Sequence, residues 1–289
     1  MKNTEGLPDR YSWFEEQIAG HHPSVIKNGK REIGILKKRN CNKLRKPKQD
    51  AKRGDCEENL YQQLDNLCRH VVNTPSEHHS KDDHFLLQLA NTSPRFYGTE
   101  KLVVDDEEHE FIILEDVTCT FKQPAILDIK MGKVTYDPLA NEEKRRKESA
   151  KYLPQTKLGF RLLGYRVHVN DQVQVRDKEW GKGFDENVYE GLTEFFKAGR
   201  EDNQEILMSF LEQLQKIQKW FEQQRVFHFY ASSLLFLYET DITLPHNIRI
   251  YMIDFSHVFP ANGELDENYL FGLNNLIRFV KEIISREFK

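Results

Sequence analysis

The longest regular pattern in the chain is an amphipathic segment between Asn203 and Gln224. Its apolar residues recur at spacings of three and four, which is the period of one helical face: Ile206, Leu207, Phe210, Leu211, Leu214, Ile217, Trp220 and Phe221. A helix with such a stripe must be packed on a hydrophobic core. The 289 residues include 38% hydrophobic residues and 19 Phe, enough for one large core or two modest ones. A disordered chain is therefore excluded.

Shorter patterns of strands and helices occupy the rest of the chain and predict a polar, two-lobed α+β protein. Alternating or continuous apolar runs predict strands at 29–38, 110–117, 124–137, 158–169, 231–239 and 247–258. Helical spacing or charge pattern predicts helices at 57–71, 141–153 and 269–284. No internal repeat is present.

The chain has no run of about 18 apolar residues, and its first residues lack the apolar core of a signal peptide. We therefore expect neither a membrane-spanning helix nor secretion. The four cysteines form no CxxC pair and have no His at metal-ligand spacing: Cys41, Cys56, Cys68 and Cys119. This favours reduced thiols in the cytoplasm or the nucleus over disulfides or a zinc site.

The formal net charge of -4 hides a basic run at residues 37–53, which contains nine Lys or Arg and a single Asp. Composition favours a solvated loop over residues 38–52. A nuclear import signal, a nucleic-acid patch and the rim of a polyanion site are the alternatives. Because no aromatic residue is interleaved with these cations, we expect no nucleic-acid partner.

Asp128 and Lys130 lie two apart in an alternating segment, so on a strand they point to the same face. Taken alone, this pattern is typical of a surface ion pair. Its context is more specific, because residues 124–132 read PAILDIKMG. This segment matches PxxxDxKxG, the signature of the inositol polyphosphate kinase family.

The resemblance to that family extends over nearly the whole chain. Gln17 to His21 resembles the family's QVAGH segment, Leu114 to Val117 its hinge, and Phe229 to Glu239 its SSLL segment. Met252 to Leu273 is similar to the tail of the multikinase branch, with its IDFAHVFP and YxxGL motifs. Several motifs in the same order are far more specific than any one of them.

The resemblance implies a two-lobed, kinase-like α+β fold of the protein-kinase and ATP-grasp kind, with ATP between the lobes. The lobes would be residues 1–116 and 117–289, with a short helical inositol-phosphate-binding segment at 133–158. The implied enzyme is a phosphotransferase with an alcohol acceptor. With ATP and Mg²⁺ as cofactors, it would phosphorylate soluble inositol trisphosphate and tetrakisphosphate. Phosphoinositide lipid head groups are a further candidate acceptor, and we expect a monomer.

Four residues of the first lobe and the hinge resemble the family's nucleotide-binding residues. Lys37, at the end of the strand GILK, resembles the lysine that contacts the ATP phosphates, and Glu57 resembles its ion-pair partner. Glu115 and Val117 would offer backbone groups to adenine. As alternatives, Lys37 and Glu57 would be ordinary surface charges. Glu115 and Val117 would lie at the end of a plain buried strand.

The second lobe carries the residues that resemble the catalytic and metal-binding groups. Asp128 would hold the ribose and organise the catalytic site, and Lys130 would contact phosphate near the acceptor. Asp254, directly after an apolar strand, is placed like the family's Mg²⁺ ligand, where a carboxylate suits a hard cation. His257 resembles a substrate-contacting histidine.

The acceptor must be met by several cations, because an inositol trisphosphate carries roughly -5 to -6 at about -1.5 to -2 per phosphate. Lys144, Lys147 and Lys151 recur on one face of the helix predicted at 141–153. By resemblance, Lys144 and Lys151 align with phosphate contacts, and Arg53 resembles another. A solvated helix would have the same composition.

The chain departs from the family pattern at a few positions. Ser256 replaces the usual Ala of DFAH, and Lys182 stands where an Arg is frequent. The segment between Gly132 and the LGFR strand is short, which implies an open pocket and broad acceptor choice. The motifs alone leave an inositol hexakisphosphate kinase as the alternative, and a non-catalytic inositol-phosphate-binding scaffold as an alternative of another class.

Overall fold

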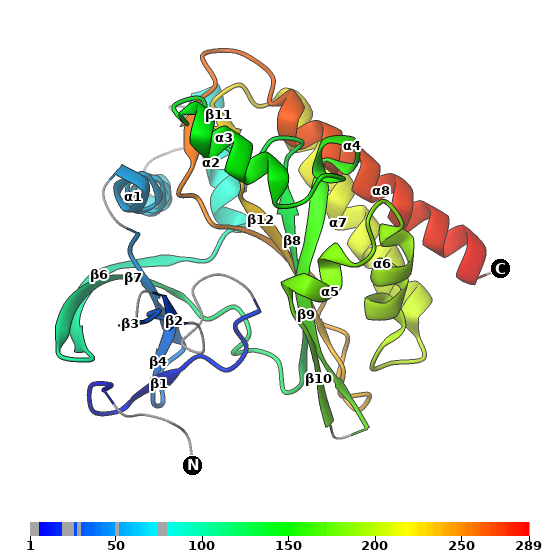
Figure 1. Ribbon diagram of the computed structural model, residues 1–289, viewed down its shortest axis with the longest axis horizontal. Helices are drawn as coiled ribbons and strands as arrows, with labels where there is room; N and C mark the ends of the chain where they lie inside the picture. Colours follow the sequence, from blue (N-terminus) through cyan, green and yellow to red (C-terminus); the bar gives the residue numbers. More distant parts are fainter. Residues whose placement is uncertain are drawn as a thin grey trace.

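Two five-stranded antiparallel sheets divide the chain into two lobes (Figure 1). The computed structural model describes residues 6–18, 26–27, 30–49, 52–73, 80–170 and 172–288. Of the predicted motif at Gln17 to His21, the last three residues lie outside the described residues. The α+β, two-lobed fold expected from the sequence is confirmed.

The first sheet has the strand order β1-β4-β5-β7-β6. Its strands are β1 (Tyr11–Trp13), β4 (Leu36–Lys38), β5 (Lys43–Pro47), β6 (Phe96–Val104) and β7 (Glu107–Glu115). A separate two-stranded pair consists of β2 (Ile26–Lys27) and β3 (Lys30–Arg31). Two helices, α1 (Lys52–Asn73) and α2 (Lys81–Asn91), connect β5 to β6.

The second sheet has the order β10-β9-β8-β12-β13, and α6, α7 and α8 lie together on one side of it (Figure 1). Its strands are β8 (Pro124–Met131), β9 (Phe160–Val169), β10 (Gln172–Arg176), β12 (Ser233–Glu239) and β13 (Arg249–Ile253). The helices are α3 (Glu142–Ala150), α4 (Gln155–Leu158), α5 (Lys178–Lys182), α6 (Val188–Lys197), α7 (Asn203–Gln223) and α8 (Glu267–Glu287). A short pair, β11 (Phe227–Phe229) with β14 (Val258–Pro260), completes the lobe. The two sheets are joined by residues 116–123, and the predicted domain boundary falls in this connection.

The main hydrophobic core lies between the second sheet and its helices. The stripe predicted on α7 is buried along its length, and only Leu211 is partly exposed. Phe221 of α7 stacks on Tyr269 of α8, with ring centroids 4.0 Å apart. Burying one such aromatic side chain contributes roughly 1.5–3 kcal/mol to stability. Residues of α7, α8 and the second sheet share one core, so the two helices hold in place the sheet that carries the DxK segment.

The prediction of a solvated loop over residues 38–52 is wrong for its central part. Residues 43–47 form β5, a central strand of the first sheet, paired with both β4 and β7. Several cations of the run are paired with carboxylates: Arg45 of β5 lies 3.0 Å from Glu100, and Lys48, just after β5, lies 2.7 Å from Glu58. Acidic residues brought close by the fold thus pair with part of a run that composition alone assigns to solvent.

The single strand predicted at 29–38 is also wrong in part. β3 and β4 are separate there, and residues 32–35 between them are not in a strand. The helices expected at 57–71, 141–153 and 269–284 correspond to α1, α3 and α8. Among the described residues, no helix combines the length and the apolar character that crossing a membrane requires.

The segment 133–158 is attached to α8 at both of its ends. The backbone N–H of Val134 donates to Asn268 Oδ1 at 2.7 Å, and Asn268 Nδ2 donates back to the Val134 carbonyl at 3.0 Å. At the other end, Gly159 adopts a left-handed conformation (φ 73°) and lies against Gly272 of α8. A Cβ on Gly272 would be 1.9 Å from the Gly159 carbonyl oxygen, so no side chain fits at this contact.

Candidate active site

A cavity of about 120 Å³ lies between the two sheets, beside their connection. One part of its wall is apolar and comes from both lobes, with Leu44, Leu114, Val117, Ile126, Leu235 and Ile253. The other part is charged, with Lys46, Asp128 and Asp254. An apolar slot ending in charges suits a ligand with a flat apolar ring at one end and an ionic group at the other.

Lys46 is held between two carboxylates from different parts of the chain. Its Nζ lies 2.6 Å from Glu57 Oε1 of α1 and 2.6 Å from Asp254 Oδ1, just after β13. Burial opposes the charge of this lysine, but Asp254 and Glu57 outweigh burial and raise its pKa. The ammonium is therefore fully charged at the edge of the cavity.

Glu57 also organises the turn that follows β13. It is completely buried and accepts hydrogen bonds from the Phe255 N–H at 3.1 Å and from the Ser256 hydroxyl at 3.1 Å. Asp254 itself has a left-handed backbone (φ 66°). Ser256, the departure from the usual Ala, thus helps to fix Asp254, and it also accepts from Gln49 Nε2 at 2.9 Å.

The ion pair expected between Lys37 and Glu57 is wrong. Lys37 Nζ instead lies 2.6 Å from Asp116 Oδ2, and Glu57 pairs with Lys46. Lys37 is not among the residues that line the cavity, whereas Lys46 is. Sequence analysis missed Lys46 because β5 has one aliphatic residue, Leu44, and so shows no strand periodicity.

The two predicted hinge residues line the cavity at the end of β7. The Glu115 N–H donates to the Arg95 carbonyl at 2.8 Å, and the Arg95 N–H donates to Glu115 Oε2 at 3.2 Å. Asp116 between them is fully buried and accepts from the Thr118 hydroxyl at 2.6 Å. Lys37 and Thr118 thus fix this short connection through Asp116.

Asp128 has an environment that opposes its ionisation. Its side chain is buried, and Oδ1 is enclosed without a hydrogen-bond partner among the described residues. Burial first, and then the neighbouring Asp254, raise the pKa of this carboxyl to about 7. A cation placed between Asp128 and Asp254 would remove this penalty.

Lys130 lies on the same face of β8, in register with Ser233 of β12 and Arg161 of β9. Burial lowers its pKa, and Asp254 counteracts this only in part. The expected grouping of Asp128, Lys130 and Asp254 is thus present, since Asp254 is close enough to affect the pKa of both Asp128 and Lys130.

His257 stands beside three charged groups from other segments. Its Nδ1 lies 2.7 Å from Asp137 Oδ2, and Lys144 Nζ lies 3.7 Å from the same oxygen. Burial lowers the pKa of His257, Lys144 and Arg53 lower it further, and Asp137 opposes them. Lys144 and His257, both predicted from the sequence, therefore lie at Asp137, which sequence analysis missed, and Arg53 is close enough to His257 to lower its pKa.

Lys151 and Lys147 are engaged at the surface of the same segment. Lys151 caps the C-terminus of α3 and pairs with Glu148 at 2.6 Å, and Lys147 pairs with Glu143 at 2.6 Å. Both lysine side chains are more than half exposed. A ligand at Lys151 would compete with Glu148 for the charge of this lysine.

The donor set fits a divalent cation bound together with an anionic ligand. Among the described residues, no group of three or more His, Cys, Asp and Glu side chains could hold a metal alone. Mg²⁺ in nucleotide sites is commonly held by one or two carboxylates, with phosphates and water completing the shell. Asp254, with a side chain 37% exposed, and the unpartnered Oδ1 of Asp128 match that pattern.

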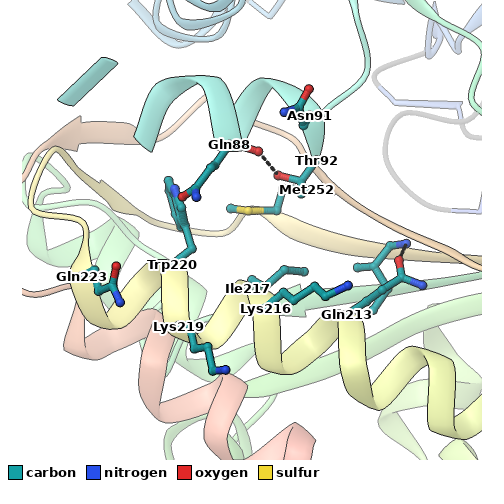
Figure 2. Close-up of a pocket in the computed structure, with 11 residues that line it drawn as sticks. Gln88, Asn91, Thr92, Gln213, Lys216, Ile217, Lys219, Trp220, Gln223 and Met252 are labelled. Carbon is teal, nitrogen blue, oxygen red and sulfur yellow. Dashed lines mark hydrogen bonds between the residues drawn. The ribbon is translucent and has the colours of Figure 1, made fainter. Parts of the chain in front are cut away.

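A larger hollow of about 500 Å³ lies elsewhere, between α2, α7 and β13 (Figure 2). Its lining combines the apolar Ile217, Trp220 and Met252 with amides such as Gln88 and Gln223. It contains none of the site residues expected from the sequence and no carboxylate. The candidate active site is therefore the smaller cavity between the lobes.

Comparisons with known proteins point to one family. The family described as "Inositol polyphosphate kinase" matches residues 111–281. An inositol polyphosphate multikinase of Homo sapiens is 30% identical over 267 residues, covering 91% of this chain and 59% of that protein. Inositol polyphosphate multikinase alpha of Arabidopsis thaliana is 27% identical over 294 residues, covering 94% of this chain and 95% of that protein.

The solved structures agree on the fold. The structure of inositol phosphate multikinase Ipk2 from S. cerevisiae in complex with ADP and Mn²⁺ has a TM-score of 0.65 at 21% identity, covering 84% of this chain and 100% of that one. The chain spans only 59% of the human relative's length. The family match nevertheless covers the DxK strand, α3, the SSLL strand, the Asp254 turn and most of α8. The chain belongs to the inositol polyphosphate kinase family.

Proposed function

We propose that the protein transfers the γ-phosphate of ATP to inositol trisphosphate and inositol tetrakisphosphate, with Mg²⁺ as the metal. The observation that carries this proposal is the juxtaposition of two differently charged sites. A partly apolar slot ends at Lys46, Asp128 and Asp254, and a group of cations from α1, β8 and α3 lies beside it. Phosphoryl transfer needs a site for the donor and a site for an anionic acceptor side by side.

On the nucleotide side, adenine would lie in the apolar slot, against the backbone of Glu115 and Val117. Lys46 takes the phosphate-contacting role that the sequence suggested for Lys37, because it lines the slot and pairs with Glu57. Asp128 would contact the ribose and, with Asp254, hold Mg²⁺. The relative bound to ADP and Mn²⁺ supports use of a nucleotide and a divalent metal. Bound Mg-ATP supplies the phosphoryl group and screens its charge.

On the acceptor side, Lys130 is placed to stabilise the charge of the moving phosphoryl group. Arg53 and Lys144 would hold phosphates of the inositol ring, and Lys151 would join them after releasing Glu148. Asp137 accepts from His257 Nδ1 when that nitrogen carries the proton, which directs the Nε2 lone pair to a ligand. His257 can then accept a hydrogen bond from an inositol hydroxyl.

The test is an acceptor panel. The purified protein is incubated with ATP, Mg²⁺ and each of inositol tris-, tetrakis-, pentakis- and hexakisphosphate, and the products are resolved by chromatography. We expect new phosphate monoesters from the tris- and tetrakisphosphates. The Lys130→Ala variant should form almost none, and Lys101→Ala, an exposed lysine paired with Glu108, should match the wild type.

The other outcomes separate the alternatives. Diphosphate products from the hexakisphosphate alone would indicate an inositol hexakisphosphate kinase. Binding of inositol phosphate without any turnover would indicate a scaffold. A phosphoinositide presented in vesicles extends the same panel to lipid head groups. The monomeric state and the location in cytoplasm or nucleus stay predictions, for light scattering and for imaging of a tagged protein.

A further inference from the structure

Arg161 of β9 lies directly opposite Lys130 of β8 in the second sheet. Residues paired in this way on antiparallel strands have side chains on the same face, close to each other. The register continues through Ser233 of β12 to Ile253 of β13, the residue before Asp254. These paired residues form a row across four strands. It runs from Ile253, next to the expected metal ligand Asp254, through Ser233 and Lys130 to Arg161.

Neither cation of this row is neutralised by the part of the protein that the structure describes. No ion pair joins Lys130 or Arg161 to a described carboxylate, and Arg161 Nε is enclosed without any hydrogen-bond partner there. Burial lowers the pKa of both groups, and Arg161 lowers that of Lys130 further. Asp128 and Glu148 favour the charge of Arg161 only from a longer distance.

Two arginines whose side chains are buried more deeply than the half-buried Arg161 have a different environment. Arg45 and Arg200 have side chains only 8% and 7% exposed, and each pairs with a carboxylate, at 3.0 Å and 2.8 Å. Burying an unpaired cation is costly, and placing two of them side by side adds repulsion. An arrangement of this kind is explained when an anion binds between the cations.

We propose that Arg161 binds a phosphate of the inositol polyphosphate acceptor, next to the phosphoryl group that Lys130 contacts. The proposal rests on the proposed kinase function and adds a residue to its acceptor site. A guanidinium suits this role because its planar N–H groups can contact two phosphate oxygens at once. Glu148 of α3 is close enough to favour the charge of Arg161, and its partner Lys151 belongs to the same segment as the other acceptor cations.

The order of the row assigns different roles to the two cations. Arg161 lies one strand, or about 4.8 Å, further from the Asp254 end than Lys130 does. Lys130 is therefore nearer to the reacting phosphoryl group, and Arg161 is nearer to a phosphate that the acceptor already carries. Loss of Lys130 should lower kcat, whereas loss of Arg161 should raise the acceptor KM.

The experiment compares Arg161→Gln and Arg161→Lys with a control, Arg166→Gln, near the other end of β9, where Arg166 contacts His168. For Arg161→Gln we expect the KM for inositol trisphosphate to rise at least about tenfold, the scale of one lost hydrogen bond to a charged group. The KM for ATP should change less than about twofold. Arg161→Lys should be intermediate, and Arg166→Gln should match the wild type.

A second measurement separates binding from structure. Without ligand, Arg161→Gln should melt at the same temperature as the wild type or higher, because it removes an unpaired, half-buried charge. The rise in Tm on adding inositol trisphosphate without ATP should be smaller than in the wild type. A lower Tm without ligand, together with an unchanged acceptor KM, would show that Arg161 is structural and would overturn the proposal.

The remaining outcomes distinguish this proposal from the proposed function. If the wild type binds inositol trisphosphate but never phosphorylates it, the kinase function fails, and weaker binding by Arg161→Gln still supports the phosphate site. If the wild type phosphorylates inositol trisphosphate and Arg161→Gln has the same KM, only the role of Arg161 is overturned. If the wild type does not bind inositol trisphosphate, both are overturned. Should Arg161→Gln not fold, Arg161→Lys decides by the same KM comparison.

Discussion

Lys46 and Asp254 are 208 residues apart in sequence, and 2.6 Å separates the Nζ of one from the Oδ1 of the other. This ion pair joins β5 of the first lobe to the end of β13 in the second. Glu57 of α1 binds the same ammonium, so three distant segments meet at one charge. A ligand between the lobes must therefore compete with, or extend, a preformed network.

The first prediction concerns which lysine contacts the nucleotide phosphates. Lys46→Ala should lower kcat/KM for ATP by at least about a hundredfold, whereas Lys37→Ala should lower it less than about tenfold. Lys37→Ala is the control, because Lys37, like Lys46, has a 2.6 Å contact to a buried carboxylate, although Lys46 has a second one to Asp254. The measurement is steady-state kinetics on variants shown to be folded by circular dichroism. A larger effect from Lys37→Ala would restore the sequence-based assignment.

The second prediction concerns the two charges nearest to the expected phosphoryl group. Lys130→Ala and Asp254→Asn should each lower kcat by at least about a hundredfold, the scale of losing one group that stabilises a transition state. Both variants should fold, because neither side chain belongs to the hydrophobic core. Near wild-type turnover in either folded variant would remove that residue from the catalytic site.

The third prediction concerns the acceptor cations of α3. Lys144→Ala should raise the KM for the inositol phosphate more than Lys151→Ala does, because Lys151 is already neutralised by Glu148 at 2.6 Å. Lys144 lies 3.7 Å from Asp137, a weaker contact. The KM for ATP should stay nearly constant in both. Parallel changes in the two KM values would place these lysines outside the acceptor site.

The fourth prediction is a pH dependence of stability that arises from Asp128. Its pKa is about 7 in the folded protein and near its ordinary 3.8 in the unfolded chain. Between these values the folded protein binds more protons than the unfolded chain. The free energy of unfolding contributed by this carboxyl therefore falls as the pH rises from about 4 to about 7.

Asp128→Asn removes that titration. The Tm of the wild type minus that of Asp128→Asn should therefore decrease by at least about 3 °C between pH 4 and pH 7, and then level off. Thermal melts without nucleotide or metal measure it, with the exposed Asp82→Asn on α2 as the control. A constant difference across this range would mean that Asp128 is ionised at little cost in the fold.

Much of the second lobe could be predicted from sequence because its elements carry strong apolar patterns. The α7 stripe, the DxK strand and the closing helix all depend on residues buried in one core. Asp128, Lys130 and Asp254 were found through the motifs around them. Their common location then followed from pairing of β8 with β12 and of β12 with β13.

The first lobe was harder to predict because long-range ion pairs replace apolar patterning there. β5 is central in its sheet although four of its five residues are Lys, Arg or Pro. Its burial depends on Glu57, Glu100 and Glu110, which only the fold brings near. Asp137 was missed for a related reason, since its partner His257 is 120 residues away in sequence.

The contact between Gly159 and Gly272 gives the fifth prediction. These glycines belong to the LGFR and YxxGL motifs, and their backbones touch where the segment 133–158 returns to α8. Gly272→Ala should displace that segment and raise the KM for the inositol phosphate at least about fivefold, with a smaller change for ATP. Kinetics with both substrates measure it, and Gly183→Ala is the control, because Gly183 has a φ of -65° and an added Cβ there would meet no atom closer than 3.3 Å.

Gly272→Ala on α8 would then raise the acceptor KM, as the loss of a phosphate-contacting residue would, although residue 272 is not part of the acceptor site. Because neither glycine leaves room for a methyl group, a bulkier residue at one position cannot be relieved by a smaller one at the other. The two positions are therefore restricted to glycine, whereas side chains of the segment itself, such as those of α3, can differ without displacing it. The position of the segment that carries Lys144 and Lys151 is in this sense set by a contact between two backbones.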